Sequence, residues 1–224
     1  METLLPIIDL FKKSFDLYIK KVWTLARIVL FGFLGLLILL PFGLVAFIIS
    51  YAPFSAGNFS INLILIDILL ALIGVFFTIF FGLWTQVATF CAVKENEINF
   101  KKALALAWPK MGSFFWISLL TALAIFAGFI LLVIPGIIFA VWFCFSIFVF
   151  VAEDLRGTAA LKKSKQLVRG YFWPVFGRMI VLGIVVSLIS WIKFFGPIIN
   201  IFFTAPFAIV FEYMLFEDLK RVKN

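Results

Sequence analysis

Paired lysines occur at four places in the sequence, and three of the pairs share one local pattern. A large apolar residue precedes two lysines, a small residue follows them, and leucine comes three positions later. The three stretches are FKKSFDL from Phe11, FKKALAL from Phe100 and LKKSKQL from Leu161. On a helix the apolar, small and leucine positions share one face, and the first lysine points away from that face. Lysines arranged in this way bind phosphate, so the pattern predicts three amphipathic helices that contact phosphate groups.

The phosphate is expected to be that of lipid rather than that of nucleic acid. The chain carries a formal charge of +8, but its basic residues lie beside apolar spans and not on a separate polar domain. Each basic residue near an anionic leaflet contributes about 1 kcal/mol to binding. The residues predicted to contact headgroups are Lys12, Lys13, Lys101, Lys102, Lys162, Lys163, Lys165 and Arg169.

Charged residues inside the apolar segments suggest ion pairs. Arg178 and Glu212 lie at similar distances in sequence from Gly196, which falls in the turn between the last two spans. The two side chains should therefore reach nearly the same depth on adjacent helices, and we predict that they form a structural ion pair. Asp67 and Lys193 fall near the opposite membrane face and could pair in the same way.

Most enzymatic chemistry is disfavoured by the residue types present. The sequence has no histidine, which removes the commonest general base and metal ligand. It contains no P-loop, dinucleotide-binding or nucleophile-elbow motif. Cys91 and Cys144 lack paired or metal-ligand spacing and are expected to pack as small apolar residues. We expect no enzyme activity, no cofactor, no catalytic residue and no metal site.

The elements that position these residues are membrane-spanning helices. The chain is 65% hydrophobic and 13% charged, with a mean hydropathy of +1.22. The runs Ile28–Ile66, Ile68–Val93 and Met111–Val151 contain no charged residue, and each exceeds the roughly 20 residues that cross a bilayer as a helix. The fold class is therefore all-α, a polytopic integral membrane protein.

Six transmembrane helices are expected, separated by turns rich in Pro, Gly and polar residues. The turns are YAPFSAGNFS at Tyr51–Ser60, Pro135–Gly136 and Phe194–Pro197. The spans are approximately Thr24–Ser50, Ile61–Thr89, Ser113–Ile134, Ile137–Val151, Phe172–Ile192 and Pro197–Leu215. The first span is expected to remain in the mature protein, because it is much longer than the apolar region of a signal peptide.

The distribution of basic residues sets the expected orientation. With six spans, all of the 19 Lys and Arg residues except Lys193 fall on the side of the two termini. The positive-inside rule then places both termini in the cytoplasm of a multi-pass cell-membrane protein.

The three lysine stretches also suggest a threefold internal repeat within one membrane domain, residues 1–224. Each repeat unit would consist of an interfacial helix, a span, a turn and a second span, with units at about 5–90, 97–152 and 157–216. The alternative is that lysine pairs simply mark the cytoplasmic borders of a basic membrane protein. The unequal spacing of the three stretches favours that alternative, whereas their matching pattern favours the repeat.

The segment IPGIIFAVWFCFSIFVFVAEDLRGTAALKKSKQLVRGYFWPVF, from Ile134 to Phe176, carries a family resemblance. It resembles the membrane domain attached to some glycerophosphoryl diester phosphodiesterases, and related uncharacterised bacterial six-span proteins. The matching positions are Pro135, Gly136, Glu153, Ala160, Leu161, Lys163, Ser164, Leu167, Val168, Gly170, Phe172 and Trp173. The resemblance implies a membrane module whose catalysis belongs to a separate domain. We expect no such domain, because the chain ends soon after the last span.

These observations predict a non-catalytic membrane module that organises anionic lipid or a partner protein at the cytoplasmic face, with homo-oligomers as a further option. The alternative function is a small-solute or lipid transporter. A transporter would need a polar cavity crossing at least half of the bilayer, on which Gln86, Thr121, Asn200 and Thr204 converge. With 32 phenylalanines in the chain, we expect a dry, phenylalanine-filled centre instead.

Overall fold

The computed structural model describes residues 4–55, 61–95, 99–191 and 196–223. Nearly all of these residues are helical, and no strand occurs among them, which confirms the all-α prediction. The helices are α1 (Ile7–Gly32), α2 (Leu34–Ser55), α3 (Ile61–Lys94), α4 (Phe100–Ala107), η1 (Trp108–Lys110), α5 (Met111–Leu131), α6 (Val133–Phe143), α7 (Ser146–Glu153), α8 (Thr158–Val168), α9 (Phe172–Ser190), α10 (Gly196–Ile199), η2 (Asn200–Thr204) and α11 (Ala205–Lys223).

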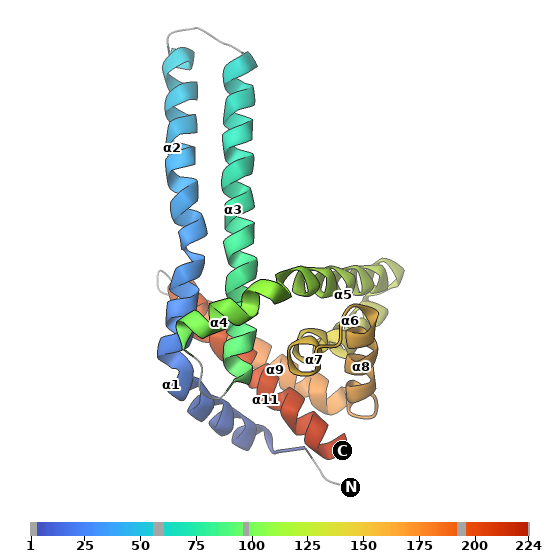
Figure 1. Ribbon diagram of the computed structural model, residues 1–224. Helices are drawn as coiled ribbons and strands as arrows, with labels where there is room; N and C mark the ends of the chain where they lie inside the picture. Colours follow the sequence, from blue (N-terminus) through green and yellow to red (C-terminus); the bar gives the residue numbers. More distant parts are fainter. Residues whose placement is uncertain (1–3, 56–60, 96–98, 192–195, 224) are drawn as a thin grey trace.

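Helices α2 and α3 form a long hairpin that projects from the rest of the molecule (Figure 1). Helix α2 contains no charged residue, and its side chains at Leu37, Leu40 and Leu44 are exposed. Apolar side chains facing outward along a helix are expected where the surroundings are lipid. Helix α2 continues through Ser55, so the first part of the predicted turn at Tyr51–Ser60 is helical, and residues 56–60 lie outside the described residues.

A second hairpin, α5 and α6, runs across the base of the first (Figure 1). The chain turns at Leu132, which has extended backbone angles of φ −169° and ψ 160°, and not at the predicted Pro135–Gly136. Pro135 instead lies in the first turn of α6. The N–H groups of a first turn have no acceptor within the helix, so the proline costs no hydrogen bond there. The absence of a side chain at Gly128 lets α5 approach Gly136 closely, because a Cβ there would lie 2.9 Å from the Gly136 Cα.

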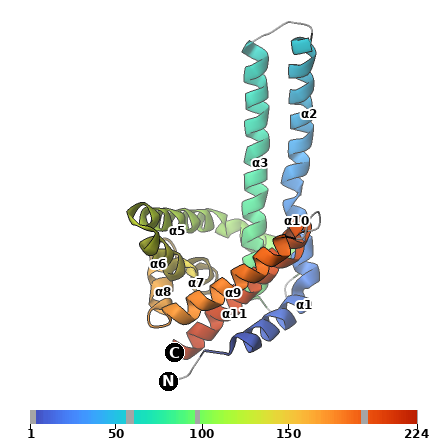
Figure 2. The ribbon, with the colours of Figure 1, turned by 180° about the vertical axis from the view of Figure 1, so that it is seen from behind.

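The last hairpin consists of α9 and the series α10, η2 and α11. Helix α9 contacts α10 and η2, and it overlaps α11 in the views of Figures 1 and 2. The segment η2 is a π-helix that ends two residues before Pro206. Proline has no N–H group and its ring clashes with the carbonyl four residues earlier, so a wider π turn accommodates it. Residues 192–195 lie outside the described residues, and with them most of the predicted Phe194–Pro197 turn and Lys193.

Five segments of the described residues are long and apolar enough to cross a membrane. They are Leu65–Lys94, Phe100–Leu131, Val133–Glu153, Phe172–Ser190 and Asn200–Lys223. Helix α2 has 22 residues and no charged side chain, and it extends about 33 Å at 1.5 Å per residue, comparable with the hydrocarbon core of a bilayer. The protein is thus an all-α polytopic membrane protein.

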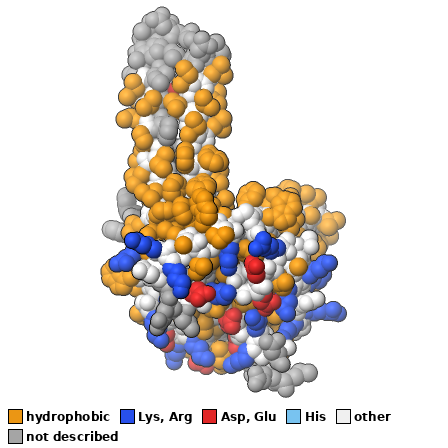
Figure 3. Space-filling model, viewed as in Figure 1, with side chains coloured by type: hydrophobic (Ala, Val, Ile, Leu, Met, Phe, Trp, Pro, Cys, Tyr) orange, Lys and Arg blue, Asp and Glu red, His pale blue; other side chains and the backbone are white. Residues whose placement is uncertain are grey.

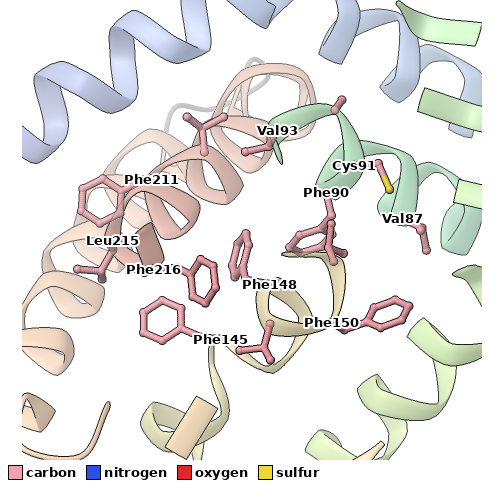
Figure 4. Packing of buried hydrophobic residues seen from close by; sticks show 14 of the residues in the cluster. Val87, Phe90, Cys91, Val93, Phe145, Phe148, Phe150, Phe211, Leu215 and Phe216 are labelled. Carbon is pink, nitrogen blue, oxygen red and sulfur yellow. The ribbon is translucent and has the colours of Figure 1, made fainter. Parts of the chain in front are cut away.

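The core lies where the ends of α3, α7 and α11 meet (Figure 4). Phe90, Phe148 and Phe216 form its centre, with ring centroids 5.0 Å apart for the first pair and 6.0 Å for the second. Cys91 is buried in this core and Cys144 is half-buried, and both carry free thiols. The core among the described residues is thus rich in phenylalanine, and the dry centre between the spans stays a prediction.

The three predicted repeat units contribute to the core in the same way. Each supplies the end of its second spanning segment, α3, α7 or α11. The small residue of each lysine stretch, Ser14, Ala103 or Ser164, has an exposed fraction of 0%. This equivalence supports the threefold repeat, which remains a prediction.

Candidate functional site: a basic face

Lysine and arginine side chains gather on the end of the molecule that carries both termini, whereas apolar side chains cover the projecting hairpin (Figure 3). We call this end the basic face. Lys12 and Lys13 on α1, Lys101 and Lys102 on α4, and Lys162 on α8 are exposed there, and Lys163 is half-buried. None of these six side chains forms a hydrogen bond or ion pair with the described residues, so their charges are available to an external anion.

The small-residue face of each lysine helix packs against protein rather than lipid. On α1 the buried residues Leu10, Ser14 and Tyr18 follow the helical repeat. A separate apolar stripe on the same helix, comprising Ile8, Phe15, Ile19 and Trp23, is exposed. The repeated pattern therefore marks the face of each helix that packs against protein. This corrects the prediction that the same face lies in the membrane interface. On α1 the exposed stripe is the face available to lipid.

The two further basic residues of the third stretch are exposed but have neighbours. The Lys165 ammonium group lies 3.9 Å from the ring centroid of Trp142, a cation–π contact. The Arg169 carbonyl accepts a hydrogen bond of 2.7 Å from Lys223. Trp142 thus holds the Lys165 side chain beside α6, while the Arg169 side chain remains at the surface.

Lys21 is a structurally important residue that the pattern of lysine pairs does not reveal. Its ammonium group donates to the carbonyl oxygens of Ala92, Val93 and Glu95, at 2.9, 2.7 and 2.6 Å. These carbonyls belong to the last turn of α3 and the residue after it, where a helix leaves acceptors unsatisfied. The helical spacing of Ser14, Tyr18, Lys21 and Leu25 places Lys21 on the buried face of α1. This spacing could have indicated from the sequence that Lys21 is buried.

Burial lowers the pKa of Lys21 to about 8, and the nearby Glu95 carboxylate partly offsets that effect. Only 7% of the Lys21 residue surface is exposed, which explains the loss of solvation of its ammonium group.

Two other lysines close helix ends in the same manner. The Lys94 ammonium group donates to the Val151 carbonyl near the end of α7, at 3.1 Å. Lys223 donates to Gln166 and Arg169 at the end of α8. Positive charge beside a helix C-terminus is favourable because the carbonyl dipoles there are negative. The lysines described so far therefore form two groups, one that stabilises helix ends and one that faces outward. Other basic side chains form ion pairs, among them Lys220 with Glu153 and Arg221 with Asp218.

The predicted ion pair between Arg178 and Glu212 is wrong, because no ion pair joins these two residues in the described structure. Arg178 instead donates to the Leu5 carbonyl at 2.6 Å and to the Pro174 carbonyl at 3.0 Å. The Leu5 N–H donates to Asp218 at 2.8 Å. Equal depth did not determine the partner of the side chain, and the N-terminal segment supplies one acceptor, the Leu5 carbonyl.

Ser164 joins the third lysine helix to the break between α6 and α7. Its hydroxyl donates to the Trp142 carbonyl at 2.7 Å and accepts from the Phe145 N–H at 3.2 Å. Both backbone groups lie where the helix is interrupted, so Ser164 replaces hydrogen bonds that the break removes.

The four polar residues that a transporter was expected to bring together lie apart. Gln86 lines a cavity of about 370 Å³ between α1, α3 and the η2–α11 region. Thr204 lines a separate, apolar cavity of about 260 Å³ between α1, α9 and η2. Asn200 bonds to Ser190, and the Thr121 hydroxyl on α5 is buried without a partner among the described residues. These residues do not form a continuous polar route.

The fold and the basic face define the class as a helical polytopic membrane protein with outward-facing lysines at one end of its packed body. Within this class, the chain belongs to the family described as a domain of unknown function, DUF7847, whose match covers residues 101–216, more than half of the chain. The match begins at the second lysine pair and includes most of the second and third predicted repeat units. No curated protein and no solved structure matches the chain significantly.

Proposed function

We propose that this protein is a non-catalytic membrane module that gathers anionic lipid at the cytoplasmic face, with both termini in the cytoplasm. The observation that supports this function most directly is the division of the lysines. Lys21, Lys94 and Lys223 donate hydrogen bonds to carbonyl groups at helix ends of the protein itself. The lysine pairs of α1, α4 and α8 have no such internal partner among the described residues, although the residue beside each pair is fully buried.

Rigid presentation gives these lysines more than a general attraction to the membrane. Ser14, Ala103 and Ser164 anchor the three helices against the body, so the neighbouring ammonium groups are held in place at its surface. Ammonium groups at a membrane surface attract phosphate headgroups, and several held together add their contributions. Anionic phospholipid is therefore the proposed partner, ahead of a partner protein or a second copy of the chain.

The absence of histidine and of recognisable catalytic motifs supports a non-enzymatic role. The resemblance of Ile134–Phe176 to the membrane domain of glycerophosphoryl diester phosphodiesterases remains a prediction, and it too favours a module without its own catalysis. The transporter alternative retains one favourable observation, the cavity beside Gln86.

The test is native mass spectrometry of the protein purified from membranes containing phosphatidylglycerol. Lys101→Glu with Lys102→Glu is expected to lower the amount of retained phosphatidylglycerol, as are the equivalent changes at Lys12 with Lys13 and at Lys162 with Lys163. Lys20→Glu is the single-charge control, because Lys20 is exposed on α1 and its pair, Lys20-Lys21, lacks the repeated local pattern. Unchanged phosphatidylglycerol in all three double variants would refute the proposed function, and subunit masses in the same spectra would reveal oligomers.

A further inference from the structure

The cavity of about 370 Å³ beside α3 has an unusual wall for a membrane-spanning helix. Thr78, Thr85, Gln86 and Thr89 line it from α3, together with Gly82. These positions follow the helical repeat, so the polar groups form one stripe along a helix whose other faces are apolar. From Thr78 to Thr89 the stripe extends about 16 Å along the helix, roughly half of the hydrocarbon core.

The threonine hydroxyls of the stripe already donate hydrogen bonds to carbonyl oxygens within α3. Thr78 donates to Gly74 at 2.9 Å, Thr85 to Phe81 at 2.7 Å and Thr89 to Thr85 at 2.8 Å. Each oxygen can still accept a hydrogen bond from a molecule in the cavity. The stripe therefore offers a ladder of acceptors.

Gln86 is the polar side chain of the stripe that lacks a protein partner. It is exposed at the cavity, and its amide forms no hydrogen bond with a described residue. An amide held in an apolar environment without a partner costs roughly 2–7 kcal/mol. Gln86 lies within the spanning segment Leu65–Lys94, so a hydrogen-bonding molecule in the cavity would remove this cost.

The remaining walls define the kind of molecule that fits. The apolar lining residues include Val29 of α1, Phe33 directly after α1, and Ile201 and Ile209 of the η2–α11 region. Among the described residues, none that lines the cavity is charged. A charged ligand would meet no counter-ion there, which disfavours it strongly at this depth. The side chain of Ile201 is partly exposed, so the cavity is accessible from the lipid side.

The π-helix η2 lies opposite the stripe and contributes Ile201 to the wall, and Pro206 follows it. Short π-helical turns inside α-helices are frequent at functional sites. Here Ile201 of the π-helix and Pro206 both border the space beside α3.

We propose that this cavity binds an uncharged lipid bearing a free hydroxyl group, of the diacylglycerol class. The lipid hydroxyl donates to a threonine oxygen and an ester carbonyl accepts from the Gln86 amide N–H, while an acyl chain lies against Phe33 and Ile201. This site is separate from the basic face and does not depend on the function proposed above.

Glycine at position 82 provides a sharp test. A Cβ added at Gly82 would meet no atom within 4 Å, so Gly82→Phe projects a ring into the cavity without a backbone clash. Gly177→Phe is the matched control, because a Cβ there also meets no atom within 4 Å and Gly177 lies outside this cavity. Gln86→Leu removes the amide while keeping a side chain of similar size.

The experiment uses the full chain in phosphatidylcholine vesicles containing a photoactivatable diacylglycerol, with the labelled peptides identified by mass spectrometry. Labelling of the wild type is expected in α3 between residues 78 and 89. Gly82→Phe should abolish it, Gly177→Phe should leave it unchanged, and Gln86→Leu should weaken it about threefold to tenfold, as for one lost hydrogen bond.

A photoactivatable phosphatidylglycerol serves as the second probe, because it shares the acyl chains but carries a charged headgroup. It is expected to label the lysine helices and not the α3 stripe. Equal labelling of the stripe by both probes, or diacylglycerol labelling that persists in Gly82→Phe, would overturn the proposal. Thermal unfolding of every variant in detergent verifies that a loss of labelling does not reflect a loss of fold.

Discussion

The ammonium group of Lys21 in α1 lies 2.7 Å from the carbonyl oxygen of Val93 in the last turn of α3. This contact links the first amphipathic helix to the end of the projecting hairpin, across 72 positions of sequence. The same ammonium group also donates hydrogen bonds to the backbone carbonyl oxygens of Ala92 and Glu95. One side chain thus replaces several of the hydrogen bonds that the end of a helix lacks.

The first prediction concerns this cap. Lys21→Met should lower the free energy of unfolding by about 1–3 kcal/mol, because it leaves buried carbonyls without donors. Lys20→Met should change it little, since Lys20 is exposed. Thermal unfolding in detergent measures both, and equal melting temperatures for the two variants would show that the cap does not stabilise the fold.

The second prediction concerns pH. The pKa of Lys21 is about 8 in the folded protein and 10.5 in its ordinary state, so between these values the unfolded chain binds more protons. Stability conferred by the wild-type residue relative to Lys21→Met should therefore rise with pH across this window, by at most about 1.4 kcal/mol per pH unit. Melting curves of both proteins at pH 7.5 and pH 9.5 test the sign, and a difference that shrinks with pH would contradict it.

The third prediction compares two serines at equivalent pattern positions. Ser164→Ala should cost about 1–3 kcal/mol, because it removes the partners of both the Trp142 carbonyl and the Phe145 N–H. Ser14→Ala should cost less, since Ser14 bonds only to the Leu10 carbonyl of its own helix. Both serines are fully buried, so the comparison isolates the hydrogen bonds. If chemical or thermal unfolding showed similar losses of stability for the two variants, the loss would be due to packing alone.

The fourth prediction separates Arg178 from Glu212. Arg178→Gln should destabilise the protein and increase proteolytic cleavage near the N-terminus, because Arg178 holds the Leu5 carbonyl. Glu212→Gln should not reproduce this cleavage, since no ion pair joins the two residues in the described structure. Limited proteolysis followed by mass spectrometry gives the answer, and matching cleavage patterns in the two variants would restore the ion-pair interpretation.

The sequence by itself determined that this is an all-α membrane protein, because long uncharged runs such as Met111–Val151 can satisfy their backbone in lipid only as helices. It also indicated the exposed side of the lysine helices, since the periodicity that buries Ala103 necessarily turns Lys101 outward. These conclusions depend on local chemistry and on a helical period, which a single chain displays directly.

Only the tertiary structure decided which charges are used internally. Lys12 and Lys21 have the same side chain on the same helix, yet the first is exposed and the second caps α3, because the end of α3 lies beside Lys21 alone. Likewise, residue spacing placed Arg178 and Glu212 at one depth but could not show that Leu5 would supply the acceptor. Depth follows from counting residues along a helix, whereas the partner of a side chain depends on how the helices rotate and pack against one another.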